Sequence, residues 1–176
     1  MKANFDASFA RIIKSEGGYV NDPADRGGET NLGVTIGAWG SYLGRAIQPG
    51  EMKALTQETV KPFYKSMYWD KVKGDDLPVG VDYAVFDFAV NAGVSRAAKF
   101  IQRAVGAVDD GVIGSGTLGR VAKTDPADLL KNFADQKQRF YNGLATTNPS
   151  QQKFLKGWLA RVDHVQDAAE SMLAQA

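Results

Sequence analysis

The sequence predicts a mainly α-helical chain. Apolar residues recur at helical spacing in several stretches, and the first of them is Phe5, Phe9, Ile12 and Ile13. A central segment, residues 78–93, is apolar on nearly every side, which is typical of a buried helix. The only piece with an extended character is short, around residues 32–34, and it follows a glycine-rich stretch. Helices therefore carry the predicted fold.

Length and composition narrow the classes of protein. The 176 residues fit one domain, or a main domain with a small companion, and 44% hydrophobic residues suffice for a core. A net charge of +1 gives no basic field that would indicate nucleic acid as a partner. Without cysteine there is no disulfide, thiol catalysis or zinc–thiolate site, and His164 as the only histidine disfavours a histidine metal site or a serine–histidine triad.

The first predicted helix spans residues 4–15 and leads to Glu16. Glu16 follows Ile12 by four positions, so it continues the apolar stripe of that helix. Burial of a carboxyl group raises its pKa, and a raised pKa suits a general acid. We expect Gly17 and Gly18 to end the helix in a left-handed cap.

Three shorter elements follow the glycine-rich loop. Thr35 is a predicted N-cap for a helix through Trp39 and Leu43, and residues 52–55 form a helical turn. Thr56 is predicted to cap the next helix, with Thr59 at the capping-box position, and Pro62 predicts a late start or a kink. Val60, Phe63, Tyr64 and Met67 form its apolar face, and Tyr68 and Trp69 close it, either lining a substrate groove or filling the core.

Asp87 and Asn91 are the polar exceptions in the central segment. At i and i+4 they share one face of the helix, and buried polar groups need partners. They either tie this helix to the glycine-rich loop or form a wall of a binding groove. We favour the structural role for Asp87, and both roles stay open for Asn91.

The second half is predicted to be helical as well. Ser95 caps a helix through Val105, and residues 104–119 form a glycine-rich loop whose Asp109-Asp110 pair lacks the ligand spacing of an EF-hand. Asp125 and Pro126 begin a long helix, and Ser150 caps the last one after a break at Asn148-Pro149. Five cations of these two helices fit an ordinary solvated face better than a surface for anionic wall components: Lys137, Arg139, Lys153, Lys156 and Arg161.

The glycine-rich segment resembles the N-acetylmuramidases of glycoside hydrolase family 108, which are phage-type lysozymes. The matching residues are Glu16-Gly17-Gly18-Tyr19 and Asp25-Arg26-Gly27-Gly28-Glu29-Thr30. The resemblance continues through Tyr68-Trp69, residues 87–93, residues 110–114 and residues 157–161, and so covers nearly the whole chain. It implies a lysozyme-like helical fold with a small β-hairpin next to the catalytic helix. Two lobes are expected, a catalytic lobe over 1–93 and a helical lobe over 94–176 that resembles a peptidoglycan-binding module, packed as one compact unit.

The resemblance also implies an activity and a set of site residues. The expected reaction is hydrolysis of the β-1,4 bond between N-acetylmuramic acid and N-acetylglucosamine in bacterial peptidoglycan. Glu16 would protonate the leaving oxygen, Asp25 would hold a water or stabilise positive charge, and Thr30 would position that water. The expected substrate contacts are Tyr19, Arg26, Trp69 and Asn91, with no cofactor and no metal.

Several alternatives stay open at this point. A lytic transglycosylase would use the same glutamate on the same bond without water, and a non-catalytic wall-binding protein would release nothing. Glu29 or Asp22 would replace Asp25 as the second acid if the loop places them opposite Glu16.

The N-terminus reads as an amphipathic helix and not as a signal peptide, and no apolar run is long enough to insert in a membrane. We therefore expect a monomer that is made in the cytoplasm of a bacterial host and acts on the wall in the periplasm. The resemblance implies an endolysin in cell lysis, released through membrane holes made by a holin.

Overall fold

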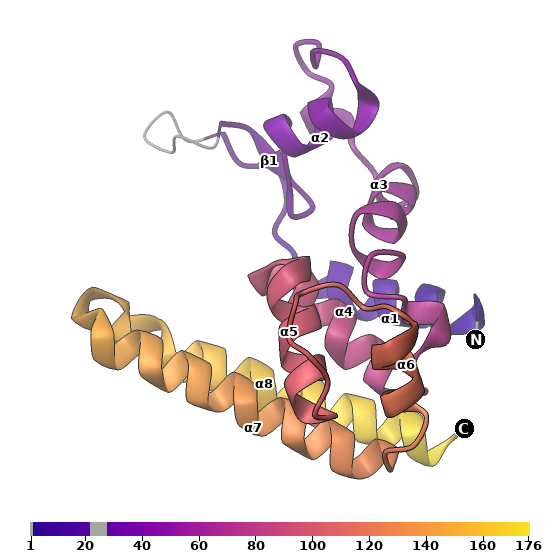
Figure 1. Cartoon of the computed structure of the whole chain (residues 1–176). Coiled ribbons are helices and arrows are strands. Elements are labelled where there is room, and N and C mark those ends of the chain that lie inside the picture. Colours follow the sequence, from indigo (N-terminus) through magenta and orange to yellow (C-terminus); the bar gives the residue numbers. More distant parts are fainter. Residues whose placement is uncertain (1, 22–27) are drawn as a thin grey trace. The chain divides into compact units, whose positions relative to one another are not determined.

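A computed structural model describes residues 2–21 and 28–176, and Figure 1 shows its course. The described residues contain eight α-helices and a single two-stranded antiparallel sheet, so the mainly α fold is confirmed. They divide into two compact units, one of residues 5–67 and the other of residues 68–176 with the N-terminal residues up to Asn4. None of these helices combines the length and apolar character that a membrane span requires.

The unit of residues 5–67 is built on an aromatic core. Its elements are α1 (Lys2–Ser15, from residue 5 on), β1 (Thr30–Asn31), β2 (Val34–Thr35), α2 (Ile36–Leu43), a 3₁₀ turn (Met52–Ala54) and α3 (Gln57–Tyr64). Phe9 of α1 packs edge-on against Tyr64 of α3, and Phe63 packs against Trp39 of α2. The apolar stripes predicted for both long helices therefore meet in this core.

Local capping fixes the helix starts in this unit. Thr35 accepts a hydrogen bond from the Ala38 N–H at 3.2 Å, as predicted. Thr56 and Thr59 form a reciprocal capping box, so a threonine fills the position where glutamate is usual. The helix starts at Gln57 despite Pro62, and a π-helical turn (Lys65–Trp69) follows it.

The larger unit is an assembly of long helices. They are α4 (Val81–Ala92), α5 (Val94–Ala104), α6 (Ser115–Val121), α7 (Pro126–Thr147) and α8 (Gln152–Ala174), with 3₁₀ turns at Gly74–Asp76 and Pro149–Gln151. The two longest helices, α7 and α8, run antiparallel as a hairpin, and α5 packs on α7 (Figure 1). Helix α4 is buried from Val81 to Ala89, and its Phe88 lies among Phe100, Phe133 and Tyr141.

Four boundaries differ from the expectation. The compact units divide between Met67 and Tyr68, so α4 groups with the helices that follow it and not with the lobe 1–93. Helix α5 starts at Val94 with Gly93 as its cap, and α8 has Gln151 as its cap, so neither Ser95 nor Ser150 caps a helix. The loop expected over 104–119 ends early because α6 begins at Ser115.

Asp110 has an architectural role in the turn before α6. Its carboxylate accepts hydrogen bonds from the side-chain amide of Gln102 at 2.8 Å and from the Val112 N–H at 2.9 Å. Gln102 is buried on α5, and its side-chain oxygen accepts the Gly111 N–H. The turn before α6 is therefore held to α5 by one amide side chain.

Two of the cations expected on a solvated face are withdrawn from solvent, Lys137 fully and Arg161 in part. Arg161 of α8 forms an ion pair with the buried Asp87 of α4 at 2.6 Å, and Lys137 of α7 is only 3% exposed. Burial lowers the pKa of Lys137 to about 8, although the Asp87 carboxylate opposes that shift. The solvated-face prediction is wrong for these two residues because their partner, Asp87, is remote in sequence. The ion pair with Arg161 therefore gives Asp87 a structural role, because it joins α4 to α8.

Candidate active site

Glu16 lies directly after the last residue of α1. The helix ends at Ser15, whose hydroxyl donates to the Ile12 carbonyl at 2.8 Å, and the Glu16 N–H donates to the Ile13 carbonyl at 3.3 Å. Gly17 and Gly18 have no positive φ, so the left-handed cap expected there is wrong. The Gly17 carbonyl instead accepts the Leu32 N–H at 3.1 Å, a tertiary bond that replaces the cap.

A tight hairpin stands against this helix end. Thr30 pairs with Thr35 and Asn31 with Val34, which leaves a two-residue turn of Leu32 and Gly33. Both turn residues have positive φ, 50° and 73°, as a type I′ hairpin turn requires. The hairpin expected next to the catalytic helix is therefore present. Its Asn31 amide also donates to the Met52 carbonyl at 2.8 Å, which fixes the hairpin on its other side.

The Glu16 carboxylate packs on the turn at Gly33. A Cβ at Gly33 would lie 2.5 Å from Glu16 Oε2 and 2.5 Å from the Tyr64 hydroxyl. Only glycine leaves room at position 33. The Glu16 carboxylate and the Tyr64 hydroxyl therefore both lie next to the Gly33 Cα. Tyr64 is buried, and its hydroxyl donates to the Leu32 carbonyl at 2.9 Å. This phenol therefore joins α3 to the turn on which Glu16 rests.

Gly33 and Tyr64 are parts of the site that the sequence did not reveal as such. Tyr64 read as one apolar residue of the α3 stripe, and its burial agrees with that interpretation. The polar end of a buried tyrosine needs a partner, and that rule was the available signal. For Gly33, the Leu-Gly pair between two short extended pieces was the signal for a hairpin turn.

Thr30 lies at the start of β1, partly buried, and its backbone exchanges two hydrogen bonds with Val20 at 2.8 and 2.9 Å. This bridge holds Thr30 opposite the chain that leaves Glu16. Asp25 and Arg26, the second predicted catalytic residue and a predicted substrate contact, lie outside the described residues, as does Asp22. Thr30 thus belongs to the hairpin beside Glu16, and the positions of the other three stay predictions.

Tyr19 and Glu29 contact each other at the edge of this site. The Tyr19 hydroxyl donates to Glu29 Oε2 at 3.1 Å, and Tyr19 is 38% exposed. An exposed aromatic ring beside a carboxylate suits contact with a sugar. Glu29, the alternative second acid, has its carboxylate engaged by this phenol.

Trp69 and Asn91 belong to the larger unit. Trp69 is fully buried, its indole N–H donates to Asp75 at 3.1 Å, and its ring packs edge-on against Phe86. It has no exposed face on which a sugar could stack, so the core role applies in this structure. Asn91 is exposed at the end of α4, and its amide donates to the Asp87 carbonyl at 2.7 Å. That bond leaves the residue accessible from solvent.

The described residues contain no group of three or more histidine, cysteine, aspartate or glutamate side chains arranged to hold a metal ion. What the arrangement offers chemically is a partly buried carboxyl group at a helix end, fixed by a rigid hairpin turn and an adjacent phenol. A carboxyl group in such a setting can give a proton to a leaving oxygen.

Comparisons with known proteins place both parts of the chain. A family described as glycosyl hydrolase 108 matches residues 9–93, and one described as a predicted peptidoglycan domain matches residues 96–163. Among solved structures, SagA of Brucella abortus is 39% identical with a TM-score of 0.85, and the match covers 98% of this chain and 97% of that one. No curated protein matches the chain.

Proposed function

Because the chain belongs to the glycosyl hydrolase 108 family, we propose that it cleaves the β-1,4 bond between N-acetylmuramic acid and N-acetylglucosamine. Family membership makes it a glycosidase, and the second match makes peptidoglycan its partner. What we propose beyond this is which bond is cleaved and that water cleaves it. Its main support is the Glu16 carboxylate, held against the Leu32-Gly33 turn beside the Tyr64 hydroxyl.

In the proposed mechanism Glu16 donates its proton to the glycosidic oxygen as the bond breaks. Cleavage leaves positive charge on the sugar ring, which needs a water molecule and a stabilising carboxylate. We assign the carboxylate role to Asp25 and the positioning of the water to Thr30. Tyr19, Arg26 and Asn91 are the proposed sugar contacts.

The decisive experiment compares the wild type with Glu16→Gln on purified sacculi, with mass analysis of the released muropeptides. The amide keeps the shape of the side chain but has no acidic proton to give, so we expect a folded protein that releases no product. Glu170→Gln, the same change on an exposed residue of α8, should cleave normally. Normal release by a folded Glu16→Gln protein would refute the assignment, and products ending in a 1,6-anhydro sugar would identify a lytic transglycosylase.

The second carboxylate is tested in the same assay. Asp25→Asn should lose activity severely but less than Glu16→Gln, because neighbours can still hold a water whereas nothing replaces the acid. Glu29→Gln should retain more activity than Asp25→Asn, since Glu29 is bonded to Tyr19. If Glu29→Gln or Asp22→Asn is inactive while Asp25→Asn works fully, the role belongs to that other residue.

We further propose that the protein acts as a monomeric endolysin on the wall in the periplasm after synthesis in the cytoplasm. The test is expression in bacteria with and without a hole-forming membrane protein. Lysis should require the hole-forming protein and an intact Glu16. Lysis by the chain alone would overturn this route, and light scattering of the purified protein tests the monomer.

A further inference from the structure

The larger unit has an open groove of about 700 Å³ between α5 and α7. Residues at the end of α4 and along α5 form one side, and residues 136–140 of α7 form the other. The groove lies within one compact unit, and most of its lining falls in the part matched as a peptidoglycan domain. Nothing in the mechanism above uses it.

Four cations line this groove, and no acidic residue does. Arg96, Lys99 and Arg103 follow one another at i, i+3 and i+7, so they share one face of α5, and Arg139 comes from α7. Because the whole chain has a net charge of only +1, this gathering is a local feature and not a general basic character. Arg139 and Arg96 are exposed on it, and Lys99 is partly buried.

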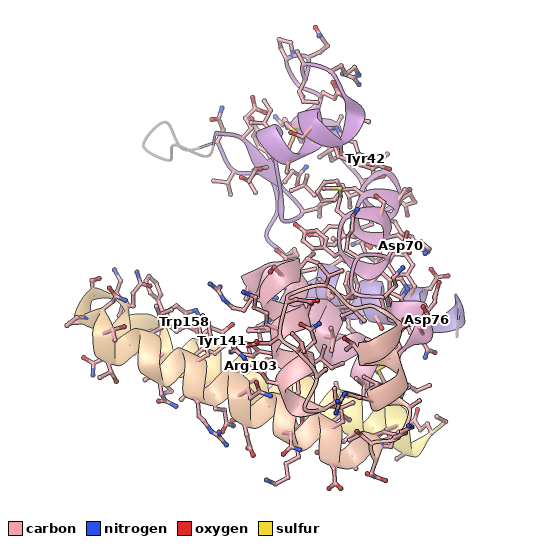
Figure 2. All side chains as sticks on the ribbon, viewed as in Figure 1. Tyr42, Asp70, Asp76, Arg103, Tyr141 and Trp158 are labelled. Carbon is pink, nitrogen blue, oxygen red and sulfur yellow. The ribbon has the colours of Figure 1, made fainter. Side chains whose placement is uncertain are left out.

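The two ends of the groove differ in how their charge is compensated. Arg103, labelled in Figure 2, forms an ion pair with Asp109 at 2.6 Å, so its charge is largely neutralised. Arg96 lies 4.8 Å above the Phe140 ring and donates to the Ala92 carbonyl, which orients its guanidinium without a counter-charge. Lys99 interacts electrostatically with Asp109 and Asp110, so the least compensated cations of the groove are Arg96 and Arg139.

Such a groove fits an extended anionic chain with spaced carboxylates. The sugars of peptidoglycan are uncharged where peptides are attached, whereas the peptide stems carry free carboxylates along their length. Guanidinium and ammonium groups bind carboxylates through charge-assisted hydrogen bonds, and aromatic rings such as Phe140 pack against aliphatic parts of a peptide.

We propose that the groove formed by Arg96, Lys99 and Arg139 between α5 and α7 binds the carboxylate-bearing peptide stem of peptidoglycan. The proposal rests on the proposed function, from which we take peptidoglycan as the polymer. The groove itself indicates only that the ligand carries carboxylates. It gives the larger unit the task of holding the peptide, while bond cleavage belongs to the unit that carries Glu16.

The test titrates the full chain with a synthetic stem peptide of alanine, γ-linked glutamate, diaminopimelate and alanine, and with the same peptide fully amidated. Calorimetry at low salt should show binding of the acid form, weaker binding of the amide form, and a loss of affinity as salt screens the exposed cations. Lys99→Gln/Arg139→Gln should weaken acid-peptide binding about tenfold or more. Lys123→Gln/Lys156→Gln, the same charge change on exposed residues outside the groove, should bind as the wild type.

Cleavage of sacculi by the same preparations separates the two proposals. A protein that cleaves sacculi but binds acid and amide peptides equally, or loses binding equally in both double variants, overturns the groove alone. A protein that does not cleave but discriminates the peptides as expected supports the groove and refutes the hydrolase. Binding of a single-stranded oligonucleotide in preference to the acid peptide would overturn the stated partner. Unchanged melting temperatures establish that both double variants are folded.

Discussion

Gly33 leaves the space in which the Glu16 carboxylate lies. Its φ of 73° belongs to the hairpin turn, and its missing side chain is the space in which Glu16 and Tyr64 approach. Gly33 must therefore be glycine for two separate reasons, its backbone conformation and the close approach of its neighbours. The two reasons can be separated experimentally because Gly44 has a positive φ but no close neighbours.

Gly33→Ala should therefore lower activity far more than stability. Strain at positive φ costs about 1–3 kcal/mol, and displacement of the carboxylate by the new methyl group should reduce cleavage about 100-fold. Gly44→Ala is the matched control, since Gly44 has a φ of 66° but open space around its Cα. It should melt lower by a similar amount and cleave sacculi normally. Equal activity of the two folded variants would show that Glu16 does not depend on this contact.

At this scale the sequence singles out Glu16 as the candidate acid but does not reveal the residues that support it. Glu16 stands out because a carboxyl group continues an apolar stripe, and the structure places it partly buried against the hairpin. Tyr64 is apolar in its spacing and polar only at its tip, so periodicity assigns it to the core and misses the hydroxyl. Its link to Leu32 joins residues 32 positions apart, a contact that no local pattern contains.

Lys137 gives a pH prediction, because burial lowers its pKa to about 8 from 10.5. Below pH 8 both folded and unfolded states hold the proton, and the folded state bears the full penalty of a buried charge. Between these pKa values only the unfolded state holds it, so the free energy of unfolding rises with pH. Relative to Lys137→Met, the wild type should gain about 2 kcal/mol between about pH 8 and about pH 9.5. Urea titrations at each pH measure this, and a constant difference would contradict the buried charge.

Helices α4 and α8 are joined by the ion pair of Asp87 and Arg161. Asp87 is 2% exposed and takes two nitrogens of Arg161, at 2.6 and 3.2 Å. Asp87→Asn should cost about 3 kcal/mol, because it leaves Arg161 and the buried Lys137 without their counter-charge. Asp163→Asn, on the exposed face of α8, should change stability by less than about 0.5 kcal/mol.

A second change tests the cause of that loss. Adding Lys137→Met to Asp87→Asn removes one of the stranded cations, so the double variant should be more stable than the sum of the single effects predicts. Thermal and urea unfolding of the four proteins complete the cycle. Strict additivity would mean that Lys137 does not respond to Asp87.

At the scale of elements, periodicity and capping predict most of the helices. Thr35, Thr56 and Asp125 all cap as expected, because each satisfies backbone groups of its own helix. One failure is the end of α1, where the Gly17 carbonyl accepts the N–H of Leu32 in the hairpin. The solvated-face prediction fails for Lys137 and Arg161 because the position of a residue on its own helix does not show which residues of other helices it contacts.

At the scale of the molecule, the two compact units have different chemical equipment. The unit of residues 5–67 holds Glu16, the hairpin and Tyr64, whereas the larger unit holds the cationic groove and the ladder of Tyr141 and Trp158 on α7 and α8 (Figure 2). The predicted border at 93/94 lies between the two matched families, whereas the compact units divide between Met67 and Tyr68. Helix α4 belongs to the larger unit because its apolar surface packs on α5, α7 and α8.

This division of equipment predicts that the groove matters only for substrates that carry peptides. Soluble glycan strands stripped of their stems by an amidase present the same β-1,4 bonds but no stem carboxylates. Lys99→Gln/Arg139→Gln should cleave stripped strands at the wild-type rate and intact sacculi more slowly at low protein concentration. The deficit should be about tenfold at low salt and should shrink as salt screens the same cations in the wild type. Product release measured by mass analysis on both substrates distinguishes the cases, with Lys123→Gln/Lys156→Gln as the control. A deficit of equal size on stripped strands would place these cations in the cleavage step itself, and no deficit on either substrate would leave the groove without a part in wall degradation.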